Sequence, residues 1–162
     1  MPAFRGPDAV DISLSVNGES VTARVVPDRS LLDVLRGSLG LTGTKLVCNE
    51  GDCGGCTVLL EDRPVYSCIT LAIACEGRRV ETIEGLAKGG ELHPVQKAFL
   101  EHDAFQCGFC TPGQVMSIVA LLRAKPQVSE DDVRRAVAGN LCRCGAYSNI
   151  VAAGMSAARK AS

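Results

Sequence analysis

Apolar and polar positions alternate in the first part of the chain, as they do in half-buried β-strands. Ile12, Leu14 and Val16 alternate with polar residues, and the Asn17-Gly18 pair that follows predicts a tight hairpin turn. The same strand character recurs further along. The segments concerned are residues 21–25, 57–60, 64–67 and 79–83, with a turn expected at residues 61–63.

One helix interrupts these strands. The apolar positions of residues 31–39 follow a helical period, with leucines on one face. Ser30 is placed to cap the start of this helix, and Gly40 to close its end. Two hairpins, one crossing helix and a closing strand predict a small α+β sheet domain.

The pattern changes after residue 84. Residues 85–91 are rich in glycine and show little periodicity, so we expect a domain boundary there, between residues 1–84 and residues 85–162. Ser129 begins a capping box in the second part. Apolar positions there recur at helical spacing, which predicts four short helices. They span residues 94–105, 112–124, 133–138 and 149–160.

Charge and hydropathy exclude several partners. The 162 residues carry a net charge of -1, and the basic residues are scattered rather than clustered, so no nucleic-acid or anionic membrane surface is expected. No apolar run approaches the roughly 18 to 20 residues that span a bilayer. The first residues also lack the charged-then-apolar order of a signal peptide. We therefore expect a cytoplasmic protein.

The cysteines change this picture most. The chain has nine cysteines, and a reducing compartment favours metal binding over disulfides. Eight of them stand in two close-spaced sets. The ninth, Cys75, lies in an apolar stretch and is expected to be a buried, inert thiol.

The first cysteine set is a single glycine-rich stretch with one distant member. Cys48, Cys53 and Cys56 follow the spacing C-x4-C-x2-C, and Cys68 comes after a strand pair. This is the plant-type spacing for a 2Fe-2S cluster. Glycines between the ligands allow backbone N–H groups to approach negatively charged sulfur. A four-cysteine zinc site is the alternative, but zinc ligands usually come in two short C-x2–4-C pairs.

The second set joins two expected helix junctions. Cys107 and Cys110 form a C-x-x-C pair directly before a helix, and Cys142 and Cys144 form a C-x-C pair after another. Spacing alone leaves three interpretations open: a second 2Fe-2S cluster, a zinc site, or a thioredoxin-like redox pair. The redox pair would leave Cys142 and Cys144 without a role.

With both sets in place, the chain resembles the small iron-sulfur subunit of the molybdenum hydroxylase family, which includes xanthine oxidase, aldehyde oxidoreductases and CO dehydrogenases. The resemblance implies an N-terminal plant-type ferredoxin-like (β-grasp) domain and a C-terminal four-helix bundle, each with one 2Fe-2S cluster. The matching stretches are Gly43-Thr-Lys, Cys48-x4-Cys53-Gly-Gly-Cys56-Thr-Val, Gln106-Cys-Gly-Phe-Cys-Thr-Pro-Gly113 and Gly139-Asn-Leu-Cys-Arg-Cys144.

The same resemblance implies a hetero-oligomer, single or dimerised, in which this chain carries no substrate site. A large subunit would hold a molybdenum pterin cofactor, and a further subunit would hold FAD. By the resemblance, the cluster of the second set lies nearer molybdenum and that of the first set nearer flavin. Gln106 and Cys144 are then expected to contact the pterin.

The substrate of such a complex is only weakly indicated. The stretch Cys142-Arg-Cys-Gly-Ala-Tyr147 is similar to that of bacterial aldehyde-oxidising members, which favours an aldehyde. N-heterocycles, CO and aromatic acyl-CoA compounds are the alternatives. Two other classes of protein stay open: a zinc-stabilised interaction module and a free-standing ferredoxin.

Overall fold

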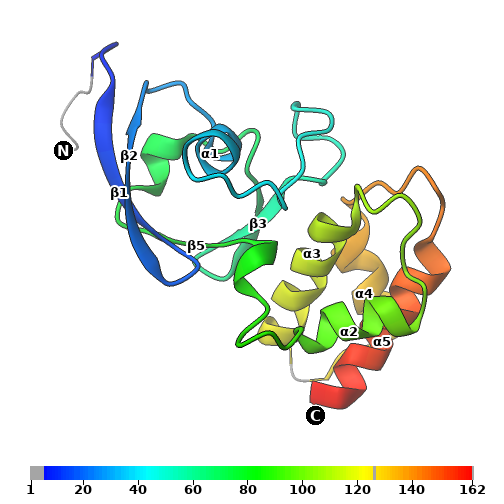
Figure 1. Cartoon of the computed structure of the whole chain (residues 1–162). Helices are drawn as coiled ribbons and strands as arrows, with labels where there is room; N and C mark the ends of the chain where they lie inside the picture. The colour runs from blue at the N-terminus through cyan, green and yellow to red at the C-terminus, as the bar shows by residue number, and fades with distance from the viewer. Residues whose placement is uncertain (1–5, 126, 162) are drawn as a thin grey trace.

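The structure, a computed structural model, describes residues 6–125 and 127–161. Strands occupy the first part of the chain and α-helices the second, so the structure is of mixed α and β type. Figure 1 shows the sheet with its crossing helix at one end of the molecule and the later helices grouped at the other. We call residues 10–85 the sheet half and residues 94–161 the helical half.

The sheet half contains one five-stranded sheet among the described residues, in the order β2-β1-β5-β3-β4. β1 (Val10–Val16) and β2 (Glu19–Val25) form the expected antiparallel hairpin. Asn17 and Gly18 turn it with φ of 54° and 88°, the left-handed values that such a two-residue turn requires. The alternating apolar residues of β1 face the core, as their pattern predicts.

The second hairpin joins β3 (Thr57–Leu60) to β4 (Arg63–Tyr66). Glu61 and Asp62 alone make the turn, both at positive φ, so Arg63 starts β4 and the expectation that it belongs to the turn is wrong. β5 (Arg79–Glu81) pairs parallel to β1 and antiparallel to β3. It is shorter than the pattern suggests because Ile83–Gly85 forms a short 3-10 turn, η3.

The crossing helix is less regular than expected. α1 (Leu31–Asp33) begins at Ser30, whose hydroxyl accepts the N–H of Asp33, and it continues as a π-helix, η1 (Val34–Ser38). The wider turn lets Leu31, Leu32, Val34 and Leu35 all be buried. A further 3-10 turn, η2 (Ala72–Cys75), was not predicted; it holds Cys75, which is fully buried as expected.

Helices make up the second half of the chain. α2 is shorter than predicted because Asp103, with a φ of 48°, turns the chain away. α3 begins one residue earlier than predicted, with Cys110 as its N-cap. The capping box of Ser129 and Asp132 opens the third of these helices, as expected. The elements are α2 (Pro94–Glu101), α3 (Thr111–Ala124), α4 (Glu130–Val137) and α5 (Tyr147–Ala161).

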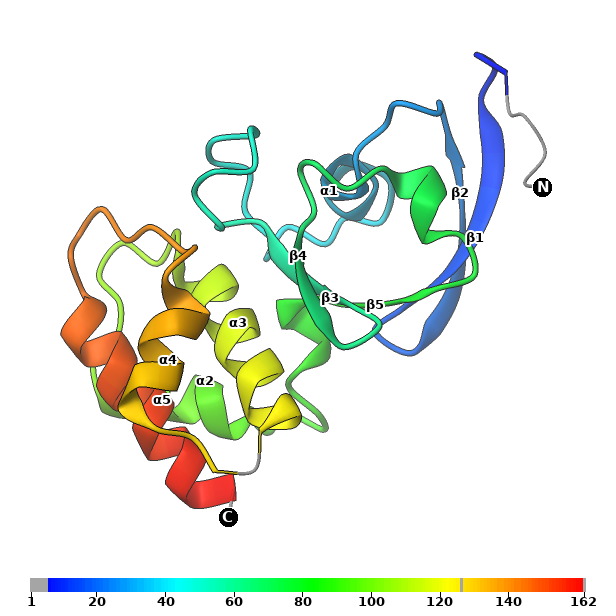
Figure 2. The ribbon, with the colours of Figure 1, turned by 180° about the vertical axis from the view of Figure 1, so that it is seen from behind.

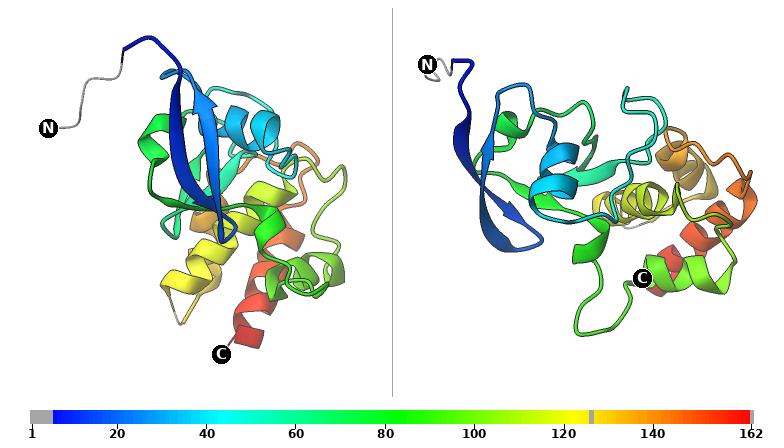
Figure 3. Two further views of the ribbon diagram at one scale, coloured as in Figure 1. Left: turned by 60° about the vertical axis from the view of Figure 1, so that its left-hand side comes forward. Right: turned by 45° about the horizontal axis from the view of Figure 1, so that its top comes forward.

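Figure 2 shows α3 next to the edge of the sheet half, with α4 and α5 farther out. β3 is buried along its whole length because both of its faces are covered. Val58 and Leu60 pack in a core with α1, whereas Leu59 points the other way and joins the core of the helical half. The two cores therefore share one strand. Figure 3 shows α1 lying against the sheet, away from α2 and α5.

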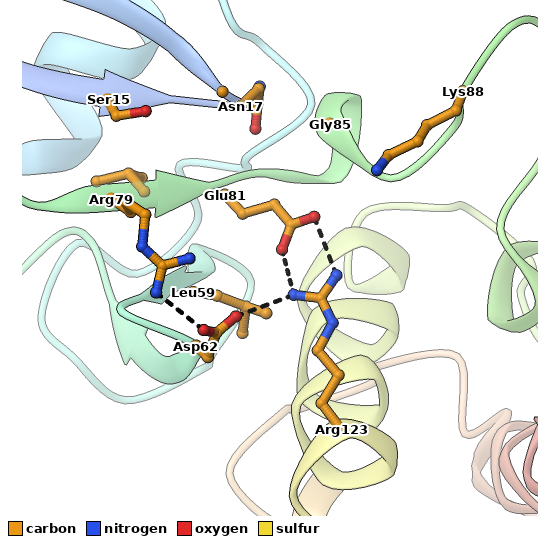
Figure 4. Close-up of a pocket in the computed structure, with 11 residues that line it drawn as sticks. Ser15, Asn17, Leu59, Asp62, Arg79, Glu81, Gly85, Lys88 and Arg123 are labelled. Atoms are coloured by element: carbon orange, nitrogen blue, oxygen red, sulfur yellow. Dashed lines mark hydrogen bonds and ion pairs between the residues drawn. The ribbon is translucent and has the colours of Figure 1, made fainter.

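Charged residues line a second junction between the halves. Arg123, near the end of α3, pairs with Glu81 of β5 and Asp62 of the β3–β4 turn, and Asp62 also pairs with Arg79. Figure 4 shows these side chains around a cavity of about 280 Å³. No helix in the described part of the chain is both long enough and apolar enough to cross a membrane.

Candidate metal centres

The first cysteine set lies in the loop that leads from α1 and η1 into β3, with Cys68 in the turn after β4. Ser67 fixes that turn, because its N–H and its hydroxyl both donate to the carbonyl of Cys56, at 3.3 and 2.7 Å. The four thiols form two pairs. Cys48 hydrogen-bonds with Cys53, and Cys56 with Cys68.

The loop backbone is arranged around the sulfur of Cys48. The N–H groups of Glu50 and Cys53 donate to it at 3.5 and 3.4 Å. Together with the N–H of Asp52, these donors lower the pKa of the Cys48 thiol to about 6, with Glu50 contributing most. Asn49 and Gly51 adopt positive φ to make this wrap. The site thus favours negatively charged sulfur before any metal is added.

Cys56 and Cys68, the other two members of the first set, are buried. Burial, followed by the neighbouring thiol of Cys56, raises the pKa of the Cys68 thiol to about 11. A proton therefore stays on Cys68 unless a cation replaces it. Metal binding supplies such a cation, because thiolates are the form that coordinates.

The second set is held where helices begin and end. The sulfurs of Cys107 and Cys144 lie 3.5 Å apart, and the thiol of Cys110 hydrogen-bonds with that of Cys142. The N–H of Phe109 and then the thiol of Cys144 lower the pKa of Cys107. Burial, followed by the Cys142 thiol, raises that of Cys110 to about 12. Each set thus has one polar pair and one buried pair.

The pairing of the thiols tests which group fits. Two sulfurs on one tetrahedral ion, with metal–sulfur distances of about 2.3 Å, lie about 3.8 Å apart. The 3.5 Å between the Cys107 and Cys144 sulfurs is close to that value. Paired thiols, with this spacing at Cys107 and Cys144, fit a cluster of two ions in which each ion has two protein ligands. No three or more His, Cys, Asp or Glu side chains in the described residues are grouped as ligands of a single metal ion, and a two-iron cluster needs only two protein ligands on each ion.

The two sets face each other across the boundary between the halves. The N–H of Leu141 donates to the carbonyl of Cys53 at 2.9 Å, so a hydrogen bond links a residue of the first set to the neighbour of Cys142. The hydroxyl of Tyr66 donates to the carbonyl of Gly139 at 2.8 Å beside it. Sequence spacing gave no indication of these contacts, because they join positions far apart in the chain.

The outer edge of the second set is open to solvent. Gln106, Cys107 and Cys144 are exposed, whereas Cys142 is buried. Apolar side chains frame the region between the two sets, and Val47, Phe109 and Leu141 are 53%, 58% and 54% exposed. With Arg143 and parts of both cysteine sets they line a groove of about 100 Å³. Exposed apolar groups of this size are typical of a surface that a partner covers.

One of the two histidines, His93, has a structural role. His93 is half-buried and caps α2, with its Nδ1 accepting the N–H of Val95 at 3.2 Å. Burial, and then the positive charge of Arg123, lower its pKa. Histidine is an uncommon N-cap, so the sequence gave little reason to expect this contact.

Two family models match the chain. The 2Fe-2S iron-sulfur cluster binding domain matches residues 14–85, and the [2Fe-2S] binding domain matches residues 82–155. The first match contains Cys48, Cys53, Cys56 and Cys68, and the second contains the other four clustered cysteines. The architecture and the matches together define the class: an iron-sulfur protein with two cluster-binding regions.

Relatives narrow the class. The aldehyde oxidoreductase iron-sulfur-binding subunit PaoA of Escherichia coli (strain K12) is 43% identical over 93% of this chain and 72% of its own length. The nicotine 6-hydroxylase small subunit of Paenarthrobacter nicotinovorans is 47% identical over 90% of this chain and 88% of its own.

Solved structures agree with these relatives. A chain of quinoline 2-oxidoreductase from Pseudomonas putida 86 superposes with a TM-score of 0.91 at 42% identity, covering 95% of this chain and 96% of that one. The aldehyde oxidoreductase of Desulfovibrio gigas gives a TM-score of 0.88 at 40% identity, over 92% of this chain but 17% of that one. This chain belongs to the iron-sulfur electron-transfer subunits of the molybdenum hydroxylase family.

Proposed function

We propose that the chain relays electrons from a molybdenum pterin centre, through two 2Fe-2S clusters, to FAD or another acceptor. Cys48, Cys53, Cys56 and Cys68 would hold the first cluster, and the second would be held by the remaining clustered cysteines: Cys107, Cys110, Cys142 and Cys144. Residues 1–84 would form a ferredoxin-like β-grasp domain and residues 85–162 a four-helix bundle. When bound, each cluster accepts and releases one electron at a time.

The observation that carries this proposal is the hydrogen bond of 2.9 Å from the N–H of Leu141 to the carbonyl of Cys53. A continuous path of covalent bonds and this single hydrogen bond thus joins the sulfur of Cys53 to that of Cys142. It supports a pair of redox centres that exchange electrons directly, and it argues against a zinc-stabilised interaction module.

Exposure supports the order that we propose for the relay. Cys107 and Cys144 form the exposed pair, and Gln106 beside them offers an amide that can both donate and accept hydrogen bonds to a pterin ring. We therefore assign the second set to the molybdenum side, with Gln106 and Cys144 as pterin contacts. The first set would face the electron acceptor.

The partners and the substrate are part of the same proposal. The exposed Phe109 and Leu141 would dock on a large molybdenum-pterin subunit, which also carries the substrate site, and a FAD subunit would complete a hetero-oligomer. Relatives named for aldehyde oxidoreductase, nicotinate and caffeine dehydrogenases leave an aldehyde as our first choice and an N-heterocycle as the second. We place maturation in the cytoplasm, where thiols stay reduced until iron binds.

Metal analysis tests the central statement. The purified complex should contain about four iron atoms and as many acid-labile sulfides per copy of this chain. On reduction it should show two distinguishable resonances in electron paramagnetic resonance (EPR) spectra. A colourless protein that contains zinc in place of iron would refute the proposal.

The assignment as a subunit has its own test. Native material from the source organism should elute in size-exclusion chromatography as a complex with molybdenum and a flavin. Elution as a single chain of 17.0 kDa that still contains iron would instead indicate a free-standing ferredoxin.

A further inference from the structure

Asn140 lies between the two cysteine sets, and no metal chemistry accounts for it. It follows α4, where its N–H donates to the carbonyl of Val137 at 2.9 Å, and it precedes Leu141 and Cys142. Its side chain is only 2% exposed. A buried amide must find partners for its N–H groups and its oxygen, so its contacts show what holds it there.

The amide uses its hydrogen-bonding groups on two different parts of the chain. Its Nδ2 donates to the carbonyl of Gly54 at 2.8 Å and to the hydroxyl of Thr57 at 3.1 Å, both in the sheet half. Its Oδ1 accepts from the hydroxyl of Ser117 on α3 at 2.8 Å. Gly54 lies between two ligand positions of the first set, and Thr57 directly follows Cys56.

The backbone of Asn140 is held as firmly as its side chain. Its carbonyl accepts the Nε2 of Gln114, a fully buried residue of α3, at 2.8 Å. Four hydrogen bonds thus hold Asn140 in place. Two of them go to the loop of the first cysteine set and its end at Thr57 (residues 48–57, the first loop), and the other two go to α3. The Nδ2 and Oδ1 of Asn140 both have partners, whereas the Oε1 of the buried Gln114 has none among the described residues.

The segments around Asn140 are packed so closely that two of their glycines have no room for a side chain. A Cβ on Gly54 would overlap the carbonyl of Gly139 and the amide of Asn140, and a Cβ on Gly113 would overlap the carbonyl of Gly54. The backbones of the two loops therefore approach each other closely, directly beside the Asn140 amide. A role limited to ending α4 would not need a side chain that reaches a residue 86 positions away.

We propose that Asn140 is a positioning residue that fixes the distance and orientation between the two clusters. By tying the first loop to the segment that precedes Cys142, it keeps the N–H of Leu141 on the carbonyl of Cys53. This inference rests on the proposed function, since it presupposes a cluster in each set. It adds a residue that touches neither cluster yet sets how fast electrons pass between them.

The test is Asn140→Ala in the assembled complex, with three measurements. Iron content should stay at that of the wild type, because every ligand is retained. The splitting that two nearby reduced clusters impose on each other's EPR signals should be lost or changed. After mixing with substrate, electron transfer from the second to the first cluster should be slower than in the wild type.

Asn149→Ala is the matched control. Asn149 is an exposed amide of the same half, and its Nδ2 donates to the carbonyl of Asp103, far from the first loop in sequence. This variant should keep both the splitting and the transfer rate. A general loss of stability in the helical half would affect both variants, whereas a positioning role affects Asn140 alone.

Ser117→Ala decides the question if Asn140→Ala fails to bind iron. It removes only the hydroxyl that orients the Oδ1 of Asn140, and it should change the splitting in the same direction by a smaller amount. Fully loaded variants with wild-type splitting and wild-type transfer would overturn the positioning role. A wild-type complex without iron would instead overturn the proposed function, so the two failures are distinguishable.

Discussion

The two cysteine sets each bring four thiols together, but they do so in different ways. The first is mainly local: three of its cysteines lie within nine residues, and backbone N–H groups of the same loop point at the sulfur of Cys48. The second exists only after folding, since it joins the start of α3 to the segment after α4. A loop of the first kind can be recognised from spacing alone, whereas the second needs the helices to pack.

Exposure separates the two sets further. In the first set Cys56 and Cys68 are buried and the other two are half-buried, whereas in the second Cys107 and Cys144 are exposed. The first set is therefore largely enclosed by this chain. The second is closed on one side only, and its open side is where a partner has to supply the missing cover.

Loss of a ligand in the second set should have the largest effect. Cys142→Ser removes the thiol of a buried cysteine, whose backbone N–H donates to the hydroxyl of Tyr147 at the start of α5, at 2.8 Å. Substrate should then reduce molybdenum but neither cluster, and turnover should be abolished. EPR spectra after mixing with substrate measure this. A first cluster that is still reduced rapidly would mean that the order of the relay is wrong.

Loss of a ligand in the first set should stop the relay one step later. Cys53→Ser should remove only the first cluster, so iron falls to about half, and reoxidation by the acceptor stalls. Molybdenum and the second cluster should still accept electrons from substrate. Stopped-flow spectra and EPR distinguish this pattern from that of Cys142→Ser; identical patterns in the two variants would show that the clusters are not in series.

The close approach of the two loops can be strained without touching a ligand. Gly54→Ala adds a Cβ at a φ of 69°, against the carbonyl of Gly139, and should lower the free energy of unfolding by about 3 kcal/mol. Gly89→Ala is the matched control. It has a φ of 58° but no atom within 4 Å of the new Cβ, and should cost about 1 kcal/mol. Equal losses in urea denaturation would contradict the packing described for Gly54.

Loss of the ion pairs of Arg123 should lower the free energy of unfolding less than Gly54→Ala does. Arg123→Gln removes the pairs with Glu81 and Asp62, which are partly solvent-exposed, and should cost about 0.5–1 kcal/mol at low salt. Most of that difference should disappear in about 1 M salt, since exposed charges are screened. Arg135→Gln, whose pair with Asp131 lies in open solvent, should change stability less than Arg123→Gln in the same thermal denaturation series.

The smallest expected effect is a change in pH dependence at His93. The neutral imidazole caps α2, and its pKa in the folded chain lies below the ordinary 6.5 because of burial and then Arg123. The unfolded chain thus binds the proton more readily, so this stabilisation is present above about pH 6.5 and is lost as the pH falls below it. Lys88 and Glu81 also act on this group.

His93→Asn keeps a capping side chain that does not titrate. Stability measured between about pH 7 and 5.5 should therefore fall less steeply in this variant than in the wild type. His102→Asn serves as the control, because His102 contributes to the end of α2 through its backbone N–H. An unchanged slope for His93→Asn would show that the imidazole is not the titrating cap.

Much of this arrangement is encoded locally and could be predicted. The Asn17-Gly18 turn, the helix start at Ser30 and the capping box at Ser129 depend on neighbours within a few residues, and the structure has all three. The spacing of Cys48, Cys53 and Cys56 likewise carries its own chemistry. The assignment of the cysteines as cluster ligands remains a prediction that metal analysis will test.

The remainder depends on contacts between distant residues. Nothing near Asn140 in sequence indicates that its amide reaches Gly54, and the partner of Tyr66 lies 73 positions away. The π-turn of η1 arises because Val34 and Leu35 are both buried against the sheet, a demand that the helical pattern alone does not express. Such features follow from how the two halves pack.

The placement of Leu59 has a consequence for how the protein melts. The side chain of Leu59 belongs to the core of the helical half, whereas its neighbours Val58 and Leu60 belong to the core of the sheet half. Unfolding of the helices would therefore expose one face of β3. Neither half can be lost without weakening the other, so heating should give a single calorimetric transition whose van't Hoff and measured enthalpies agree. The two fragments obtained by dividing the chain at residue 85 should accordingly both aggregate when they are produced separately.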